Sequence, residues 1–562
     1  MNIKKKIITD ALIGQVNIED KDSELVIGLV APLGANDEAV ANLVFDQLQN
    51  RYGYHVTWSK LSEVLQGELN LESRDKFKSV YEYYDTYING GNELREKSED
   101  ASLLALRVIE LIHRHRKDSA EGRKMRRSAV IVSSIKHPRE VEALRRVYGP
   151  GFFLIGVHSQ PSARLERLKR DKNVADDDAR RLIVRDEAED NPFGQQTRAT
   201  FELCDAFVWL ESDRMARELT TILELLFGNY MVTPTRDELS MFNAYAVSLR
   251  SGDLSRQVGA VIVSRDNDVI AIGANEVPRA GGGLYWQDDG YKCRDLELKR
   301  DYNARERRRL AIRILSSFNK YITYAKTSAQ IEVDDCKARE ELVEKFAGWL
   351  TDNLDDDELL EETGIMDITE YGRTVHAEME AILACARCGV TPRGSTLFTV
   401  TFPCHNCAKH IVAAGIQRVV YIEPYPKSKA EELHGDALQT WSINEPSKYE
   451  DILAGECDDE SDFERISRTF ALSSQKVIFE PFRGVAPRRF ADLFALRTPF
   501  GARIKRSTDG CLNDWDHNSA EVKTPVLRFS YIDLEGVVVK LIKEYDQKHI
   551  AEPGQSAETA KN

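Results

Sequence analysis

The chain has 562 residues, of which 42% are hydrophobic and 30% are charged, as in an ordinary globular protein. That length predicts two or more domains, and no apolar run is as long as a membrane-spanning helix needs. The formal net charge of −15 argues against sequence-independent nucleic-acid binding, which requires a dense footprint of lysine and arginine. The basic N-terminus precedes no signal-peptide core, so we expect a cytoplasmic protein.

The N-terminal part alternates apolar runs with helical patterns. Residues 25–30 are predicted to form a buried strand, and the apolar spacing from Asp37 to Arg51 predicts a helix. Further strands are predicted at 129–132, 152–157 and 206–210. This order predicts a mostly parallel, doubly wound sheet with helices on both faces, in a domain that spans residues 1–228.

The loop after the first strand lies where a phosphate-binding loop would lie, but its sequence is degenerate. The working motif is G-x-x-x-x-G-K-[ST], whereas Gly28 and Gly34 are one residue too far apart here. Ala35 and Asn36 replace the lysine and the hydroxyl residue, so phosphoryl transfer is not expected. The backbone at the following helix could still hold an anion. The arginine-rich stretch 171–200 is either a lid or a solvated helix.

A second α/β unit is expected at 229–445, with an insertion at about 279–370. Its predicted strands are 258–263, 269–273, 396–400 and 418–422, and its predicted helices are 377–388 and 405–414. We expect residues 446–550 to form a C-terminal extension that packs on this unit. The polar tail at 551–562 is predicted to be disordered.

Two short motifs in this unit indicate its chemistry. A His-Ala-Glu motif supplies His376 and Glu378, and a Pro-Cys-His-Asn-Cys motif supplies Cys404 and Cys407. Together they match the signature of the zinc-dependent base deaminases. The two cysteines are one turn apart at a predicted helix N-terminus, which favours the ligating thiolate form. With His376 they would leave one tetrahedral zinc position open for water, and Glu378 would move protons.

The cysteines have two other interpretations. A structural zinc site usually has four protein ligands, whereas these motifs supply three. Cys385 and Cys388 form another C-x-x-C pair, and Cys293 and Cys336 lie in the insertion. A second zinc is less expected than core cysteines, because no further ligand pair keeps a suitable spacing with them.

Further motifs resemble the deoxycytidylate deaminase family. Residues 250–263 contain Arg-Ser and Gln-Val-Gly-Ala-Val-Ile-Val, residues 272–278 show a G-x-N-x-x-P turn, and Ala-Lys follows the last motif cysteine. The resemblance covers roughly 236–430. It implies a three-layer α/β/α cytidine-deaminase-like domain that binds zinc and converts dCMP or dCTP to the deoxyuridine nucleotide and ammonia.

The same resemblance implies several substrate contacts. Asn275 in the turn would contact the sugar or phosphate of the nucleotide, and Ser255 and Arg256 belong to a loop that lies near the phosphate in relatives. Tyr425 and Lys427, just after the last predicted strand, are further candidates for phosphate contact. A plain turn at Ser255 and Asn275, and a surface charge at Arg256, remain the structural alternatives.

The whole chain is similar to bacterial anti-phage deoxycytidine nucleotide deaminases that carry an N-terminal P-loop kinase-like domain. Residues 185–198 and 479–490 contain the matching sequence. This resemblance implies nucleotide depletion during infection and regulation of the enzyme. The regulator at the N-terminal domain could be a nucleotide, an RNA or a phage protein, or that domain could serve only assembly. Relatives also form hexamers, which implies a homo-oligomer.

Other functions stay open at this point. A deaminase acting on tRNA or single-stranded DNA would use the same zinc pocket, but the acidic charge and the turn at Asn275 disfavour it. A silent, purely regulatory deaminase fold is disfavoured by the intact Glu378. A bifunctional kinase and deaminase is disfavoured by the degenerate loop. The preference for mono- or triphosphate, the trigger and the role of the insertion are not readable from sequence.

Overall fold

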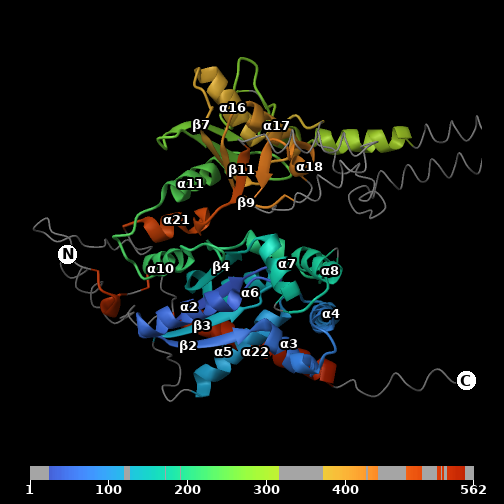
Figure 1. The fold of residues 1–562 in the computed structure, drawn as a ribbon, viewed down its shortest axis with the longest axis vertical. Coiled ribbons are helices and arrows are strands. Elements are labelled where there is room, and N and C mark those ends of the chain that lie inside the picture. The colour runs from blue at the N-terminus through green and yellow to red at the C-terminus, as the bar shows by residue number, and fades with distance from the viewer. Residues whose placement is uncertain are drawn as a thin grey trace, which may run out of the picture. The chain divides into compact units, whose positions relative to one another are not determined.

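The computed structural model describes residues 24–118, 127–170, 172–189, 191–290, 292–314, 371–425, 428–440, 476–496, 515–520, 522–523 and 528–550. The chain divides into two compact units (Figure 1). The first contains residues 1–242, 440–456 and 480–562, and the second contains residues 243–439 and 457–479.

The first unit is built on a six-stranded sheet with the order β12-β5-β4-β1-β3-β2. The pairings β2–β3, β3–β1, β1–β4 and β4–β5 are parallel, whereas β12 pairs with β5 in the antiparallel sense. The strands are β1 (Leu25–Val30), β2 (His55–Lys60), β3 (Ser128–Ser133), β4 (Phe152–His158), β5 (Ala206–Trp209) and β12 (Gly484–Val485). The parallel sheet predicted from the apolar runs is therefore present, with β2 and β12 added at its edges.

Helices cover both faces of this sheet, as the sequence predicted. α2 (Asp37–Asn50) and α10 (Met215–Leu226) pack on one face, where Ile27, Ile131 and Ile155 belong to one buried cluster with residues of both helices. The alternate strand residues face the other side, because successive side chains in a strand point in opposite directions. α6 (Pro138–Tyr148) and α9 (Thr197–Phe201) contact the sheet on that side.

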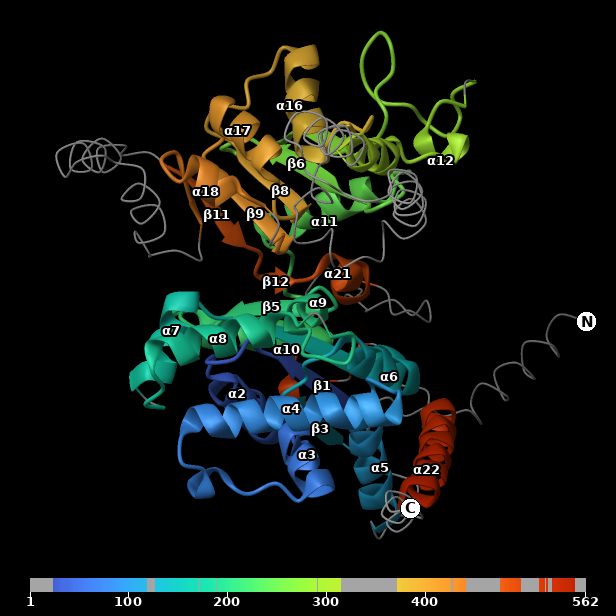
Figure 2. The ribbon, with the colours of Figure 1, turned by 90° about the vertical axis from the view of Figure 1, so that its right-hand side faces the viewer.

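The unit has further helices, of which α21 joins the layer of α2 and α10, because Leu493 belongs to their buried cluster. Figure 2 shows α4 crossing in front of α3, and α22 lying beside α5. Their bounds are α3 (Leu61–Leu69), α4 (Val80–Ser98), α5 (Leu103–Asp118), α7 (Pro161–Arg170), α8 (Asp176–Glu187), α21 (Pro487–Phe494) and α22 (Arg528–Ile550). The arginine-rich stretch 171–200 thus contains α8 and α9, whose arginines pair with acidic neighbours, for example Arg185 with Asp85 at 2.7 Å.

The C-terminal segment differs from the prediction. Residues from 480 onward group with the N-terminal unit, whereas the sequence suggested that 446–550 pack on the second unit. The physical reason is twofold. β12 extends the first sheet through β5, and Glu535 of α22 forms a buried ion pair with Arg116 of α5 at 2.7 Å.

The second unit contains another six-stranded sheet, with the order β10-β11-β9-β8-β6-β7. β6 pairs with β7 and β8 in the antiparallel sense, and β8 pairs with β9 in parallel. The strands are β6 (Gly259–Val263), β7 (Val269–Ala274), β8 (Thr396–Thr401), β9 (Arg418–Glu423), β10 (Leu438–Thr440) and β11 (Val477–Pro481). The predicted strands are confirmed to within one residue at each end.

Two glycines set the distance between this sheet and its helices. A Cβ on Gly259 would lie 2.0 Å from the Ala244 carbonyl oxygen of α11 (Arg236–Ser248). A Cβ on Gly273 would lie 2.1 Å from the Ala377 carbonyl oxygen of α16 (Ala377–Cys388). Gly273 pairs with Ala260, the neighbour of Gly259, so the two glycines face opposite sides. The expected α/β/α layering is therefore present.

α16 and α17 (His405–Ala413) lie next to each other on one side of the second sheet (Figure 2). α12 (Asp295–Leu298) and α18 (Ala430–His434) complete the helices with assigned bounds. Most of the predicted insertion, residues 315–370, lies outside the described residues, as do the predicted tail and Lys427. No described helix is long and apolar enough to cross a membrane.

Candidate metal centre and nucleotide pocket

The three predicted metal ligands come from the N-terminal ends of two adjacent helices. His376 is the N-cap residue of α16 and Cys404 is the N-cap residue of α17, both with extended backbone. Cys407 lies in the first turn of α17, where it is fully buried among the apolar residues between helix and sheet. Cys404 therefore directly precedes the helix that was predicted at 405–414.

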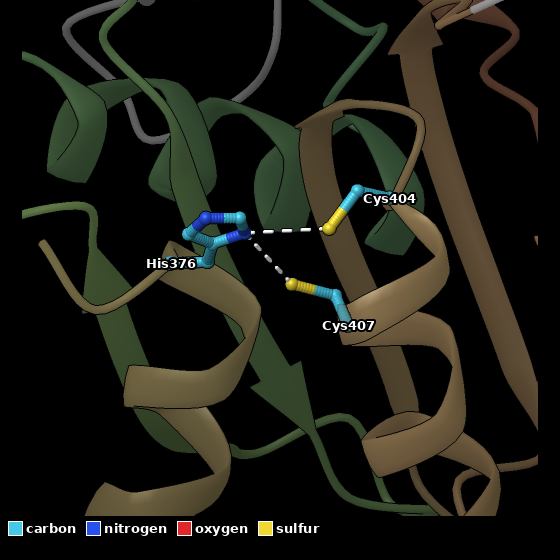
Figure 3. A group of neighbouring side chains, drawn as sticks. All are labelled: His376, Cys404 and Cys407. Atoms are coloured by element: carbon cyan, nitrogen blue, oxygen red, sulfur yellow. Dashed lines mark hydrogen bonds between the residues drawn. The ribbon is translucent and has the colours of Figure 1, made fainter. Parts of the chain in front are cut away.

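The donor atoms of these residues converge on one point (Figure 3). The His376 Nδ1 atom is 3.4 Å from the Cys404 Sγ atom and 3.3 Å from the Cys407 Sγ atom. All three donors lie within 4.8 Å of one another. A tetrahedral zinc ion with bonds of about 2.1 Å to nitrogen and 2.3 Å to sulfur would need edges of about 3.6–3.8 Å. The cluster therefore fits a small tetrahedral cation with three protein ligands.

The three side chains of the cluster shift one another's pKa values. Hydrogen bonds from Cys407 and His376 lower the pKa of Cys404 to about 4, so this sulfur is a thiolate at neutral pH. The Cys404 thiolate in turn raises the pKa of His376 to about 9. The same thiolate and burial raise the pKa of Cys407 well above its usual range. A bound dication would displace these shared protons, because only deprotonated side chains ligate metals.

Glu378 lies beside the cluster in the first turn of α16. Its Oε2 atom is 3.5 Å from the Cys407 Sγ atom, and the residue is 5% exposed. Burial, and then the Cys404 thiolate, raise the pKa of this carboxyl group above its usual range. A carboxyl group with a raised pKa can both accept and release a proton near neutral pH, as a general acid and base must.

The cluster opens into a cavity of about 420 Å³, a size typical of small-molecule sites. Its lining brings together His376, Cys404 and Glu378 with four of the five predicted substrate residues, Ser255, Arg256, Asn275 and Tyr425. The fifth, Lys427, lies outside the described residues. The roles of these residues in binding a substrate stay predictions.

The Asn275 side chain forms two hydrogen bonds within the protein. Its Oδ1 atom accepts from the Val258 N–H at 2.7 Å, and its Nδ2 atom donates to the Arg256 carbonyl oxygen at 2.7 Å. These two bonds hold the loop that precedes β6 against the turn that follows β7. Each atom of the amide keeps one further bonding position, since an amide oxygen accepts twice and an amide nitrogen donates twice.

The other loop residues are partly tethered. The Ser255 hydroxyl donates to Asp253 Oδ1 at 2.6 Å, and the Arg256 guanidinium is 3.3 Å from Glu423 Oε2. Arg256 keeps 46% of its side-chain surface exposed. Its guanidinium can therefore turn toward an anion at the mouth of the cavity more readily than a buried arginine could.

Sequence reasoning missed several residues of the cavity. Arg307, Asn303 and Asp301, from the start of the insertion, and Arg373, just after the undescribed part, all line it. Arg373 pairs with Asp295 at 2.8 Å and lies over the Tyr302 ring. The available signal was the run of arginines at 305–309 in an acidic chain, but nothing in the pattern placed this run at the cavity.

Cys385 and Cys388 do not belong to the group of described residues that has metal-binding geometry. Cys385 is buried in the core between α16 and the sheet, and Cys388 is exposed. Among the described residues, His376, Cys404 and Cys407 are the single group found with metal-binding geometry. Cys385 therefore packs as a core residue, while Cys336 lies outside the described residues.

The four residues of the degenerate phosphate loop fall on a strand, a turn and the start of a helix. Gly28 lies inside β1, where a Cβ would lie 2.6 Å from the Leu154 side chain, so its role is packing. Gly34 turns the chain with a φ of +84°. Ala35 and Asn36 then lead into α2, and Asn36 caps it without a side-chain hydrogen bond.

Comparisons with known proteins agree with the sequence motifs. Residues 234–423 match the family model described as "Cytidine and deoxycytidylate deaminase zinc-binding region". The chain is 47% identical to ComE operon protein 2 of Bacillus subtilis over 53 residues, and 46% identical to the deoxycytidylate deaminase of Enterobacteria phage T4 over 55 residues. These matches support the deaminase family for this part of the chain.

The matched segments are short. They cover 9% and 10% of this chain, and 28% of each of those two relatives. Among solved structures, the dCMP deaminase of cyanophage S-TIM5 in apo form aligns with 36% of this chain and 94% of its own length, at 17% identity and a TM-score of 0.18. Residues 1–233 and 424–562 lie outside the family match.

Proposed function

We propose that this protein is a zinc-dependent deaminase of free deoxycytidine nucleotides, converting dCMP, dCTP or both to the deoxyuridine nucleotide and ammonia. The observation that carries the proposal is the convergence of His376, Cys404, Cys407 and Glu378 at one end of a cavity of about 420 Å³. A purely structural metal site would not need a buried carboxyl group beside it, or a cavity.

Different residues of the chain would bind the metal and transfer the protons. A zinc ion held by His376 and the two cysteines would supply a water molecule with a pKa near about 7, which is nucleophilic at neutral pH. Glu378 would accept a proton from the attacking water and deliver protons to ring N3 and to the departing amino group. The C4–N bond breaks, a C4–O bond forms, and one water is consumed for each ammonia released.

The polar groups at the cavity mouth favour a free nucleotide. Arg256 and Arg307 supply positive charge to which the phosphates of a nucleotide can bind, and Asn275 holds the loop that carries Arg256. A net charge of −15 disfavours a long polyanion such as DNA or RNA. By resemblance, we extend the proposal to nucleotide depletion during phage infection, by a cytoplasmic homo-oligomer that an unidentified signal controls.

The direct test is conversion by the purified full-length chain. We would incubate it with zinc and, separately, dCMP, dCTP, CTP, cytidine and single-stranded DNA, and measure ammonia and the deaminated product. Glu378→Ala serves as the control. We expect turnover of dCMP or dCTP that the variant loses.

The other results are equally informative. Turnover of single-stranded DNA that weakens steeply with added salt would support the nucleic-acid alternative instead. Lack of turnover on every substrate, in a protein shown to carry one zinc, would contradict the proposed activity under these conditions.

A further inference from the structure

Glu276 is a buried acidic residue in the turn after β7, and the metal centre and the predicted substrate contacts leave it without a role. It directly follows Asn275, which lines the cavity beside the metal cluster, and only 1% of its surface is exposed. Burying a carboxylate is costly unless charged and polar groups surround it. The partners of Glu276 therefore show what the residue does.

The Glu276 carboxylate connects two separate parts of the chain. Its Oε2 atom accepts from the Gly252 N–H at 3.0 Å and from Arg294 Nε at 2.8 Å. The Arg294 Nη2 atom lies 2.7 Å from the same oxygen, and its side chain is also buried. The other oxygen accepts from the Val277 N–H at 2.9 Å. The pair thus joins the loop at 250–256, which precedes β6, to the start of the predicted insertion.

Both partners of the carboxylate are next to residues of the cavity wall. Asp253 follows Gly252 and Asp295 follows Arg294 in the chain, and both aspartates line the cavity. The side chain of Glu276 therefore fixes the distance between two parts of the wall that come from separate segments.

One of these parts carries the predicted phosphate contacts. Asp253 Oδ1 accepts from the Ser255 N–H at 2.9 Å and from the Ser255 hydroxyl at 2.6 Å. The Arg256 N–H also donates to it, at 3.4 Å. The position of Gly252 thus sets the position of Asp253 and, through it, those of Ser255 and Arg256.

Gly252 packs against the ion pair with no room for a side chain. A Cβ at this position would collide with the Arg294 Nη2 atom and would lie 3.0 Å from the Glu276 Oε2 atom. Arg294 Nη2 also donates to the Arg250 carbonyl oxygen at 3.4 Å, so the loop backbone itself holds the guanidinium there. A glycine at 252 is therefore what lets the loop approach the pair.

The metal ligand His376 is connected to Glu276 in a different way, through the backbone of its neighbour. The Glu276 N–H donates to the Val375 carbonyl oxygen at 3.3 Å, and the Val375 N–H donates to the Glu276 carbonyl oxygen at 3.0 Å. A substitution of the Glu276 side chain leaves both bonds available. The metal centre and the loop should therefore respond differently to such a substitution.

We propose that Glu276 is a positioning residue of the deaminase, which together with Arg294 holds residues 250–256 in the conformation that binds the nucleotide. This inference rests on the proposed deamination of nucleotides. It gives the pair a role in substrate affinity and none in metal binding or proton transfer, because the cavity is lined by neighbours of both residues and by neither residue itself.

The first test is steady-state kinetics of the zinc-loaded, full-length protein with dCMP and with dCTP. Glu276→Gln keeps the size of the side chain and removes its charge. It should raise KM about tenfold, as the loss of a hydrogen bond to a charged group predicts, while kcat changes less than about threefold and one zinc per chain is retained. A purely structural role predicts the opposite pattern, because a smaller folded fraction lowers the apparent kcat and leaves KM unchanged.

Further variants keep the test independent of how well one variant folds. Gly252→Ala keeps both charges but pushes the guanidinium away from the carboxylate, and should raise KM in the same way. Adding Arg294→Gln to Glu276→Gln should raise KM no further, because the two residues act as one unit. Glu297→Gln is the matched control and should change neither constant, since Glu297 accepts from the backbone N–H of Arg294 at 3.1 Å and glutamine can replace it there.

Hydrogen exchange separates this inference from the proposed function, because it needs no turnover. In Glu276→Gln, backbone amides at 250–258 should exchange about tenfold faster than in the parent, whereas those of α16 should keep their rates. A parent protein that deaminates no nucleotide would contradict the proposed function, and the exchange at 250–258 would still decide whether Glu276 orders the loop. The positioning role is overturned if that exchange is unchanged, or if the variants lower kcat or zinc content and leave KM as it is.

Discussion

Glu378 is the residue proposed to transfer protons without binding the metal. It does not belong to the three metal ligands, yet it lies 3.5 Å from the Cys407 sulfur. Glu378→Gln keeps the shape of the side chain but cannot take up a proton. We expect deamination to fall about 10²–10⁴-fold while one zinc per chain is retained, measured by ammonia release and by metal analysis. Loss of zinc in this variant would mean that Glu378 acts on the metal site instead.

The cysteines differ in what their removal should do. Cys404→Ser and Cys407→Ser remove a donor from the cluster and should lower the zinc content of the purified protein well below one per chain. Cys388→Ser is the matched control, because this exposed cysteine lies on α16 away from the cluster. It should keep one zinc and full activity. A fall in metal content in the control would reveal a second site.

Asn275 gives a prediction about loop order rather than chemistry. Asn275→Ala removes two partly buried hydrogen bonds, to the Val258 N–H and to the Arg256 carbonyl oxygen. Unfolding in urea should show a loss of about 1–3 kcal/mol, because the two backbone groups lose their partners. The KM for the nucleotide should rise more than kcat falls, since the loop carrying Arg256 becomes mobile. An unchanged KM would show that the loop does not contact substrate.

At the residue scale, the sequence predicts which side chains lie together when those residues are close in the chain. His376 and Glu378 lie two positions apart, and the two cysteines lie three positions apart. This short spacing alone predicts that each pair lies together at one helix N-terminus. The Asp186 carboxylate, which accepts from the Leu33 N–H in the loop after β1, could not be predicted, because this bond joins residues 153 positions apart. No local pattern distinguishes that buried aspartate from its charged neighbours.

Among the secondary-structure elements, β7 and α16 meet closely beside the candidate metal ligand His376. A Cβ on Gly273 would lie 2.1 Å from the Ala377 carbonyl oxygen, and Ala377 lies between His376 and Glu378. Gly273→Ala should therefore push α16 away from the sheet, lowering both thermal stability and zinc affinity. Gly290→Ala is the control, because nothing lies within 4 Å of its Cβ. Equal zinc affinity in the two variants would show that α16 tolerates the shift.

The elements themselves were largely predictable, and for a physical reason. The apolar runs at β1, β3, β4 and β6 are buried throughout, and a buried strand reads as an unbroken apolar stretch. β2 was missed because His55, Thr57, Ser59 and Lys60 make its sequence polar, and its first residue is exposed. Edge strands with one solvated side lack the signal that identifies central strands.

For the molecule as a whole, the two units are not consecutive stretches of sequence. The chain completes the first unit only after it has passed through the second, since residues 480–562 return to the first. The predicted first domain, residues 1–228, therefore lacks the C-terminal segment that completes this unit. Local composition could not show that β12 pairs with β5, because the partners lie almost 280 positions apart, Gly484 opposite Phe207.

This connectivity predicts how stability divides between the units. Glu535 is fully buried and pairs with Arg116, which is 2% exposed. Glu535→Gln leaves a buried arginine with less compensation and should destabilise the first unit by about 3 kcal/mol. Arg170→Ala, which removes an exposed pair with Glu166, should change stability by less than about 1 kcal/mol.

Calorimetry can assign these changes to a unit. If each unit unfolds as its own cooperative transition, Glu535→Gln should lower one midpoint and leave the other in place. A zinc chelator should do the converse, because metal binding stabilises the unit that holds His376 and the two cysteines. A single transition that both changes lower together would show that the units unfold as one body. In that case metal binding in the second unit would also stabilise the first, which would link the two units thermodynamically.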